Sequence, residues 1–566
     1  MTERIGRRTW AKRAFSLAQA FTPGNAAVCR AGTACLAASS GTRGATRRRR
    51  GMVLVIVTVV VAIISLAGLA FVTTMHAEGK AVRVQGEQIQ LEHVVGSGAE
   101  LLKAVLGQSW EAQREAGGVW DNPRLFRAVV VVEDEETGRR VRCSVVAPSG
   151  GGDGRSASIR FGVENESARL NLGVLLQWEQ REPGSAHRAL MSLPEMTDAI
   201  ADAILDWLDP DSSPRQFGAE ADYYRGLGVP YAPRNGVPQC LEELLLIRGV
   251  TRPLLFGPEG SLDLPSQPRG RQAAERLRVG AFSSSPPWAS LVTVSSAERN
   301  RTADGRPRID LNQDKLALLH QQLLEAFEPR WADFVVLYRQ HGPYSGSRAG
   351  DPSGPPLDLT LPAKVRLESV LDLIDAKVQI PAAAGRTSPV VASPFASDPA
   401  ALRQDLPKLM DRTSTESDAV IYGRVNVNAA AREVLRAVPG LDGAAVEQIV
   451  AARGLAAGPE PADRRHATWL LAEGLVDLSR MKALLPYLTG GGDVARAQIV
   501  AFFDPPGPSL RAETVIDATA SPPRQVYWKD LRLLGRSHGL EGLGADAAGG
   551  GSVAPARAPR HARPTR

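Results

Sequence analysis

The chain has 566 residues, which exceeds the usual size of one hydrophobic core, so we expect several packing units. Its 43% hydrophobic and 23% charged residues are typical of a protein that folds. The net charge of +6 is uneven: residues 1–51 carry +10 and residues 537–566 carry +2, so the part between them carries −6. Nucleic-acid binders need clustered positive charge to neutralise phosphates, and an acidic central part argues against that class of function.

Cysteine and histidine are too sparse to predict catalysis by a transition metal. Beyond the basic N-terminus the cysteines are Cys143 and Cys240, which lack the Cys-x-x-Cys spacing of a zinc site. They form either one disulfide or, as we favour, two unpaired buried thiols. The eight histidines are scattered, and no Gly-x-x-x-x-Gly-Lys-Ser/Thr phosphate loop occurs. We therefore predict that the protein is not an enzyme.

An uncharged and mostly apolar run follows the basic leader, residues 1–51. Residues 52–72 are long enough to span a bilayer as a helix, and Arg47–Arg50 immediately precede them. By the positive-inside rule the arginines stay in the cytoplasm and the rest of the chain is exported. The competing interpretation is a cleaved signal peptide, whose apolar region is shorter. Apolar residues continue at helical spacing, so we predict a single-pass anchoring helix over residues 52–107.

Strand patterns occur in two parts of the chain that are far apart in sequence. In residues 108–185 we expect strands at 126–132, 140–146 and 158–163. In residues 486–536 we expect strands at 495–503, 510–518 and 525–531. The second set suits the completion of one antiparallel sheet that helical insertions interrupt. Residues 537–566 are expected to be a disordered tail.

The sequence between these parts predicts helices and short strands. Residues 186–280 are expected to form a helical insertion, 281–315 a β segment, and 316–420 an insertion with loops and helices at 315–328 and 365–377. Within residues 421–485, Val438–Asp442 separates two helices and predicts a helix-hairpin-helix, with Gly440 allowing the tight turn. DNA-binding versions carry glycine where this chain has Asp442, whose charge repels phosphate, so we favour a packing role.

One short pattern recurs three times, at Arg169–Gly173, Arg308–Asn312 and Arg424–Asn428. Alternating residues in the last two predict short edge strands, and the final asparagine is expected to cap a following helix. Asn428 fits this expectation best, with a helix expected over residues 429–438. We interpret the pattern as structural.

The N-terminal motif resembles a known family. Arg47-Arg-Arg-Arg-Gly51 followed by Met52-Val-Leu-Val-Ile-Val resembles the class III leader of type IV pilins and type II secretion pseudopilins. The resemblance implies cleavage by prepilin peptidase after Gly51, which leaves Met52 as the first residue. Most members have glutamate where this chain has Ile56, and the lack of this glutamate is typical of minor pseudopilin K.

Later segments also resemble minor pseudopilin K, the general secretion pathway protein K family. They are residues 164–172, Asp206–Asp211, Gly218–Tyr224, Leu241–Val250 and the helix-hairpin-helix. The resemblance implies an α+β fold: a pilin-like N-terminal transmembrane helix, an antiparallel sheet and large helical insertions. It implies a subunit at the tip of the periplasmic pseudopilus that supports protein export. Implied partners are the other minor pseudopilins, the major pseudopilin, prepilin peptidase and the inner membrane, with the C-terminal domain in the periplasm.

Members of that group carry calcium, and one acidic segment of this chain suits the ion. Our candidate ligands are Asp209, Asp211, Glu220 and Asp222, which offer hard oxygen atoms at short spacing but lack the EF-hand order. The competing interpretation is a solvated loop with helix-capping carboxylates. For the whole chain, the alternative function is a membrane-anchored DNA receptor of the competence type, which also joins one membrane helix to a helix-hairpin-helix. A third hypothesis, an anchored enzyme, lacks a convergent polar cluster.

Overall fold

The computed structural model describes residues 50–134, 139–148, 159–257, 285–351, 356–381, 388–453, 462–504, 507–534, 539 and 542–544. The chain divides into two compact units, residues 1–79 and 80–566, which we call the first and second units. Most of the basic leader and of the tail expected over residues 537–566 lies outside the described residues, as do the turn 136–138 and the glycine-rich stretch 150–154.

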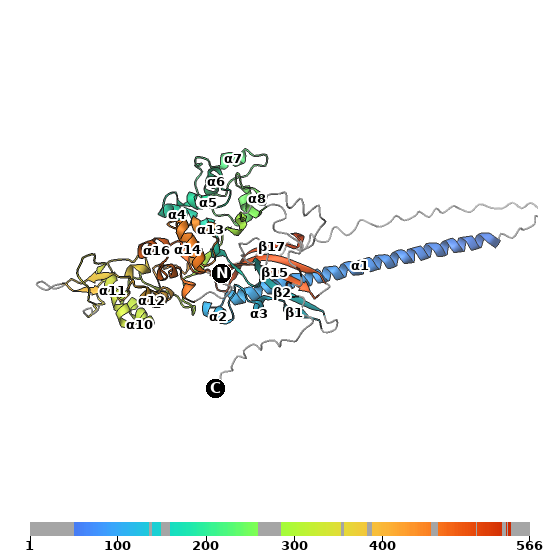
Figure 1. The fold of residues 1–566 in the computed structure, drawn as a ribbon. Coiled ribbons are helices and arrows are strands. Elements are labelled where there is room, and N and C mark those ends of the chain that lie inside the picture. Colours follow the sequence, from blue (N-terminus) through green and yellow to red (C-terminus); the bar gives the residue numbers. More distant parts are fainter. Residues whose placement is uncertain are drawn as a thin grey trace, which may run out of the picture. The chain divides into compact units, whose positions relative to one another are not determined.

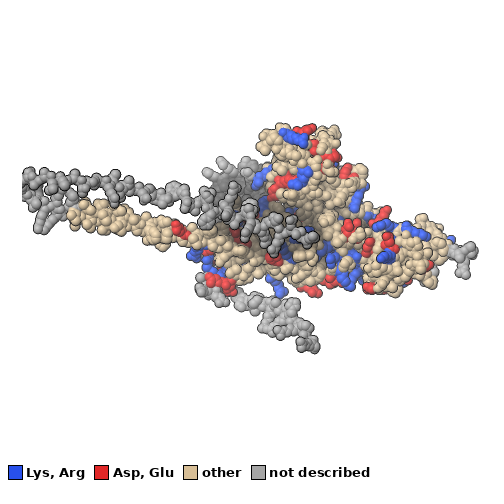
Figure 2. All heavy atoms as spheres, turned by 180° about the vertical axis from the view of Figure 1, so that it is seen from behind, with Lys and Arg blue, Asp and Glu red and all other residues tan. Residues whose placement is uncertain are grey.

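Helix α1 (Arg50–Leu106) contributes to both units and confirms the single long helix expected over residues 52–107. In the first unit its side chains from Val53 onward are exposed and largely aliphatic. By its length and composition the helix is able to cross a membrane. In Figure 2 the exposed apolar part of this helix is tan, without lysine, arginine, aspartate or glutamate.

The second unit contains an antiparallel sheet built from both predicted strand regions (Figure 1). Its main strand order is β1-β2-β15-β16-β17, and β3 pairs with β2 while β4 pairs with β15. The strands are β1 (Val129–Glu133), β2 (Arg140–Pro148), β3 (Ile159–Arg160), β4 (Glu164–Asn165), β15 (Val494–Phe503), β16 (Ser509–Asp517) and β17 (Arg524–Asp530). Because β15 pairs with β2 over six residues, the expected joining of the two regions in one sheet is confirmed.

The last turns of α1 pack on this sheet and form one hydrophobic core with it. Leu91, Val95 and Leu102 of the helix share this core with Ile499 and Phe502 of β15. Gly98 marks the closest approach, because a Cβ added there would lie 2.7 Å from both Cys143 Sγ and Ile499 Cγ2. Both cysteines beyond the leader are unpaired, as we favoured; Cys143 is buried, but Cys240 is only half-buried.

A second and larger core joins most of the helices of the second unit. In chain order they are α4 (Leu175–Arg181), α5 (Ser185–Met191), α6 (Asp198–Leu208), α7 (Ala221–Arg225), α8 (Arg252–Phe256), α10 (Leu316–Ala326), α11 (Pro329–His341), α12 (Pro399–Arg412), α13 (Arg432–Ala437), α14 (Gly443–Arg453), α15 (Trp469–Ala472) and α16 (Leu478–Leu484). Two short helices lie outside this core: α2 (Trp110–Glu115) buries no residue, and α3 (Pro123–Phe126) places Phe126 in the core shared with α1. The helix expected at 315–328 corresponds to α10. The helix expected at 365–377 is wrong: the segment holds one 3-10 turn, Val370–Leu373, which starts with a capping box between Ser369 and Asp372. The chain leaves helical geometry at Ile374, which is extended, and Asp375 follows with a φ of 51°.

Short two-stranded pairings connect these helices. The strands are β5 (Leu170–Asn171), β6 (Val292–Thr293), β7 (Ala297–Arg299), β8 (Ile309–Asp310), β9 (Lys377–Gln379), β10 (Val390–Ala392), β11 (Thr413–Ser414), β12 (Val420–Tyr422), β13 (Val425–Asn426) and β14 (Leu488–Thr489). The β segment expected over residues 281–315 therefore consists of β6, β7 and β8, none longer than three residues.

The three copies of the arginine-containing pattern adopt the same local structure. Each forms a two-residue parallel bridge, β5 with β6, β8 with β11 and β13 with β14. In each copy the third residue accepts a hydrogen bond from the backbone N–H two residues later: Asn171 from Gly173 at 2.8 Å, Asp310 from Asn312 at 2.8 Å, and Asn426 from Asn428 at 2.9 Å. The structural interpretation therefore agrees with the local geometry.

The capping role expected of Asn428 is wrong. Helix α13 begins at Arg432 with Ala431 before it, and the side chain of Asn428 instead donates to the carbonyl oxygens of Arg464 and Gly490, both at 2.7 Å. The chain then turns at Gly440, whose φ is 83°, before α14. Asp442 occupies the N-cap position of α14, where it accepts from Ala445 N at 2.7 Å and pairs with Arg480 at 2.8 Å.

Candidate metal centre

The acidic site is built at the end of a buried helix. Helix α6 begins after Thr197, whose side chain accepts a hydrogen bond from Ile200 N at 3.3 Å. Its last turn is buried in the larger core, with Trp207 only 2% exposed. Because the helix end is buried, the carboxylates on it are buried too: Asp206 is 0% exposed and Asp209 is 6% exposed.

The chain returns to this helix end through a tight loop. Arg215 donates to Asp206 at 2.7 Å and to Asp209 at 2.5 Å, and its backbone N–H also faces Asp206. A Cβ at Gly218 would lie 1.8 Å from Asp206 Oδ2, so only glycine allows the loop to pass this closely. The loop delivers Glu220, which is 6% exposed, to the N-cap position of α7.

Three of the four predicted ligands come together. One carboxylate oxygen from each of Asp209, Asp211 and Glu220 lies within 4.8 Å of the other two. Asp222 is not part of this group: its side chain is fully exposed on α7, with Arg225 4.0 Å away. The spacing in sequence did not reveal this difference, because residues 220 and 222 lie on opposite sides of the start of α7.

The cluster contains carboxylate oxygens that lack hydrogen-bond partners. In the described part of the chain, Asp209 Oδ1 and both oxygens of Glu220 are buried without one. Asp211 is exposed and accepts from Ser213 N at 2.8 Å. A buried charge without a partner is costly, so an arrangement of this kind calls for a bound cation or a proton.

The raised pKa values of the two buried candidate ligands also indicate a site that favours a bound cation or a proton. Burial raises the pKa of Asp209, and the neighbouring charges of Asp211 and Asp206 add to this shift. Burial also raises the pKa of Glu220, again with repulsion from the aspartates around it. Both groups would be relieved by a hard divalent cation. Carboxylate oxygens are the ligands that calcium prefers, and its remaining positions are commonly filled by water or backbone carbonyls.

Aromatic residues connect the acidic site to the rest of the second unit. Trp207 packs edge-on against Tyr224 of α7 with ring centroids 5.4 Å apart, and its Nε1 donates to Glu243 at 3.2 Å. Asp206 and Arg215 also belong to the site and were not among the predicted residues. Asp206 begins the acidic segment that also holds Asp209 and Asp211, and this position was the available signal for it, but nothing in the sequence indicated the contact of Arg215.

The predicted processing site has a simpler setting. Gly51 and Met52 lie in the first turn of α1, two residues or fewer from its start at Arg50. The structure describes their backbone as helical.

The acidic site lies inside a segment that matches a known family. Residues 168–255 match the family model described as "Type II secretion system (T2SS), protein K". The resemblance to protein K is confirmed for this segment. A type II secretion system protein K of Aeromonas hydrophila is 38% identical over 78 residues, which are 13% of this chain and 24% of that protein. The protein K of Pectobacterium carotovorum subsp. carotovorum is 34% identical over 97 residues, which are 16% of this chain and 27% of that protein.

The matched part thus spans about a quarter of the length of these relatives. Among solved structures, the crystal structure of the GspK–GspI–GspJ complex from the enterotoxigenic Escherichia coli type 2 secretion system covers 79% of this chain and 98% of its own chain, at 13% identity and a TM-score of 0.34. The fold of this chain itself combines a long apolar N-terminal helix, an antiparallel sheet and mixed helices and strands, which agrees with the expected α+β class.

Proposed function

We propose that this protein is a minor pseudopilin of a type II secretion system, resembling subunit K, that assembles at the tip of the periplasmic pseudopilus and supports protein export. The observation that carries the proposal is the match of residues 168–255 to the protein K model. The long apolar helix that precedes the sheet supplies the second requirement, a segment able to anchor the subunit and later to pack in a fibre.

The proposed orientation follows from charge. Arg47–Arg50 keep the leader in the cytoplasm, α1 crosses the inner membrane once, and the second unit lies in the periplasm. Prepilin peptidase cuts after Gly51, and Met52 becomes the N-terminus. No other reaction is assigned to the protein.

The proposed position at the tip rests on Ile56. Most family members carry glutamate at this position, and a carboxylate in lipid needs a partner. An aliphatic residue removes that requirement, so the subunit needs no preceding neighbour in the fibre. The proposed partners are two other minor pseudopilins and the major pseudopilin. In the solved structure from enterotoxigenic Escherichia coli, GspK forms a complex with GspI and GspJ.

We further propose that Asp209, Asp211 and Glu220 bind calcium and that Asp222 does not. The unpartnered buried oxygens of Asp209 and Glu220 support this assignment. A calcium ion bound there would join the end of α6 to the start of α7 and would stabilise the second unit. For residues 421–485 we propose a helix-hairpin-helix with a packing role. The carboxylate of Asp442 accepts from the backbone N–H of Ala445 in α14 and pairs with Arg480, so this backbone amide is not available to a phosphate.

Processing of the N-terminus tests the pilin-like part of the proposal. The full chain is expressed in membranes with and without prepilin peptidase, and the product is analysed by intact mass and N-terminal sequencing. We expect a peptidase-dependent start at Met52 and no cleavage of a Gly51→Ala variant. A chain that remains uncut, or is cut beyond Val72, contradicts the proposal.

A further inference from the structure

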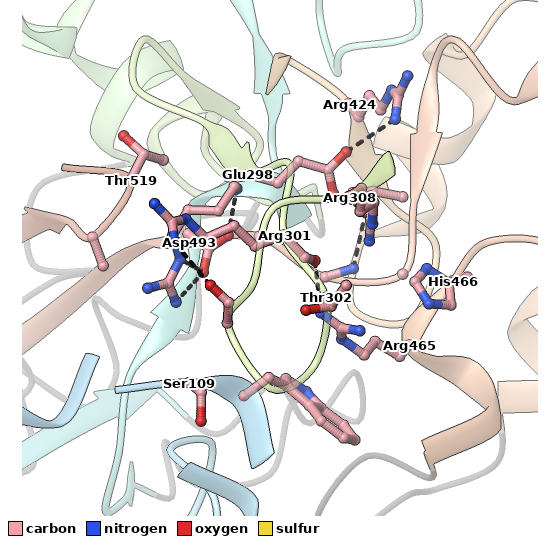
Figure 3. Close-up of a pocket in the computed structure, with 18 of the residues that line it drawn as sticks. Ser109, Glu298, Arg301, Thr302, Arg308, Arg424, Arg465, His466, Asp493 and Thr519 are labelled. Carbon is pink, nitrogen blue, oxygen red and sulfur yellow. Dashed lines mark hydrogen bonds and ion pairs between the residues drawn. The ribbon is translucent and has the colours of Figure 1, made fainter. Parts of the chain in front are cut away.

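A polar cavity of about 380 Å³ lies within the second unit, and none of the residues of the acidic site lines it (Figure 3). Segments that are far apart in sequence form its walls. They are the start of α2 at Ser109 and Trp110, the connection between β7 and β8, residues 465–467 before α15, the loop 489–493 before β15 and the loop 518–523 between β16 and β17. Its volume suits a small ligand rather than a single water.

The walls of this cavity carry an excess of positive charge. Five arginines line it, Arg299, Arg301, Arg308, Arg424 and Arg465, against three carboxylates, Glu298, Asp304 and Asp493. Three of the arginines are paired: Arg299 with Asp493 at 2.7 Å, Arg424 with Glu298 at 3.1 Å, and Arg465 with Asp411. Asp304 is engaged by Arg306, which does not line the cavity.

The remaining two arginines have no carboxylate partner in the described part of the chain. Arg308 uses only its Nε, which donates to the carbonyl oxygen of Asp411 at 3.2 Å. Arg301 uses one terminal nitrogen, which donates to Gly305 O at 2.8 Å. The other guanidinium N–H groups of both residues are therefore available, and both residues line the cavity.

The repeated pattern shows that this lack of a partner is specific to Arg308. Arg169, at the first position of the first copy, pairs with Glu164 at 2.7 Å and with Glu166 at 2.9 Å. Arg424, at the first position of the third copy, pairs with Glu298. Arg308 occupies the same position in the second copy, on the same kind of parallel bridge, but it lines the cavity and forms no ion pair with a carboxylate among the described residues.

Neighbouring groups do not fully compensate for the charge of Arg308. Burial lowers the pKa of Arg308, and repulsion from Arg465 and Arg424 adds to this shift, while attraction to Glu298 and Asp411 opposes it only in part. Burial and the positive charges of Arg308 and Arg465 hold the pKa of His466 well below its usual value, so this ring is neutral at pH 7. The arginine itself remains charged, since a guanidinium does not lose its proton in proteins. A cation in this setting is stabilised most directly by an anion in the cavity.

We propose that this cavity binds a small multivalent oxyanion of the carboxylate or phosphate type, with Arg308 as the main ligand and Arg301 as the second. The planar fork of a guanidinium matches two oxygens of such a group, which gives it an advantage over an ammonium. Trp110, with Arg465 stacked 5.2 Å from its ring centroid, and Leu488 form apolar parts of the wall. The anion would join the β7–β8 connection to the loops of the sheet.

Titration calorimetry on the full chain in detergent tests this assignment. Calcium-free protein is titrated with sodium phosphate and, separately, with sodium succinate, each against sodium chloride of equal ionic strength. We expect saturable binding at one site for at least one probe, and the probe that binds identifies the phosphoryl or the dicarboxylate class. Absence of saturable binding with both probes up to millimolar concentration overturns the proposal.

Variants identify the ligands. We expect Arg308→Gln to weaken binding at least tenfold and Arg308→Lys to weaken it as well, because lysine lacks the fork. The control is Arg330→Gln on α11, which removes an exposed arginine that does not line the cavity and should bind like the parent. Should Arg308→Gln fail to fold, Arg301→Gln replaces it, since Arg301 is exposed and its loss should also weaken binding. Unchanged affinity in a folded Arg308 variant, or in Arg301→Gln used in its place, contradicts the proposal.

Discussion

Asp209 and Glu220 place carboxylate oxygens within 4.8 Å of each other although both residues are buried. Asp209 Oδ1 and both oxygens of Glu220 lack a hydrogen-bond donor in the described part of the chain. Two negative groups so close together repel each other in a poorly solvated site, and this repulsion is the energetic basis of the proposed calcium binding.

Replacing Glu220 should have opposite effects with and without calcium. Without the ion, Glu220→Gln removes a buried unpaired charge and should raise the melting temperature. With calcium at about 100 times its Kd, the parent gains about 2.7 kcal/mol of stability, and the variant should lose most of this gain. The measurement is thermal unfolding of the full chain in detergent followed by tryptophan fluorescence. A variant that responds to calcium like the parent would rule out Glu220 as a ligand.

Asp222→Asn provides the matched control and a separate prediction. Asp222 is close in sequence to Glu220, but its side chain is fully exposed and lies outside the carboxylate group. We expect the variant to keep the calcium-dependent rise in melting temperature of the parent. Loss of that rise would restore Asp222 as a ligand and contradict the geometry of α7.

The effect of Glu220→Gln should depend on pH in calcium-free buffer. The pKa of Glu220 is raised in the folded protein, so between its usual and folded values the native state binds more protons than the unfolded state. Stability from this group is therefore lost as pH rises through the folded pKa. The stabilisation by Glu220→Gln should be largest above that pKa and should shrink as the pH falls toward 4.5, the usual pKa of a glutamate. A difference that stays constant from that pH up to neutrality would contradict the raised pKa.

Two glycines of α1 should respond differently to alanine. A Cβ at Gly98 meets Cys143 and Ile499 at 2.7 Å, so Gly98→Ala should destabilise the protein by about 1–3 kcal/mol through overpacking. A Cβ at Gly96 meets nothing within 4 Å, and Gly96→Ala should be neutral or stabilise by about 0.5–1 kcal/mol through helix propensity. Urea unfolding of the full chain in detergent measures both. Equal effects would show that α1 does not pack on the sheet through Gly98.

Asp442 should act as a helix cap rather than as part of a DNA site. Asp442→Ala removes the bond to Ala445 N and should cost about 1 kcal/mol, whereas Asp442→Asn keeps the capping oxygen and should cost less. Unfolding measurements on the two variants test the cap. Duplex DNA binding by the parent that weakens with salt would instead favour the competence-type alternative.

Much of the fold could be predicted from periodic patterns of apolar residues within short stretches of sequence. Alternation predicted β2, β15 and β16, because apolar side chains at alternate positions, such as Val141, Cys143 and Val145 of β2, enter the core that these strands share with α1. Uninterrupted apolar spacing predicted α1. The prediction for segment 365–377 was wrong although its apolar spacing is helical: the capping box at Ser369 starts a 3-10 turn, and the extended Ile374 and the positive φ of Asp375 end it after one turn.

The candidate site was predictable only in part. Proximity in sequence placed Asp209 and Asp211 together, because a short loop keeps them close. It failed for Asp222, because this residue lies two positions after Glu220, within α7, and its side chain is exposed to solvent. It also could not predict the contact between Arg215 and Asp206, which are nine residues apart. The arginine cavity was not foreseen either, because its walls come from segments hundreds of residues apart.

The most direct test of the proposed function is protein export in the source bacterium. The gene is deleted, and the strain is complemented with the parent or with Gly51→Ala. We predict that substrates of the type II system accumulate in the periplasm of the deletion strain, that the parent restores their export, and that Gly51→Ala does not. Normal export in the deletion strain would contradict the assignment as a minor pseudopilin.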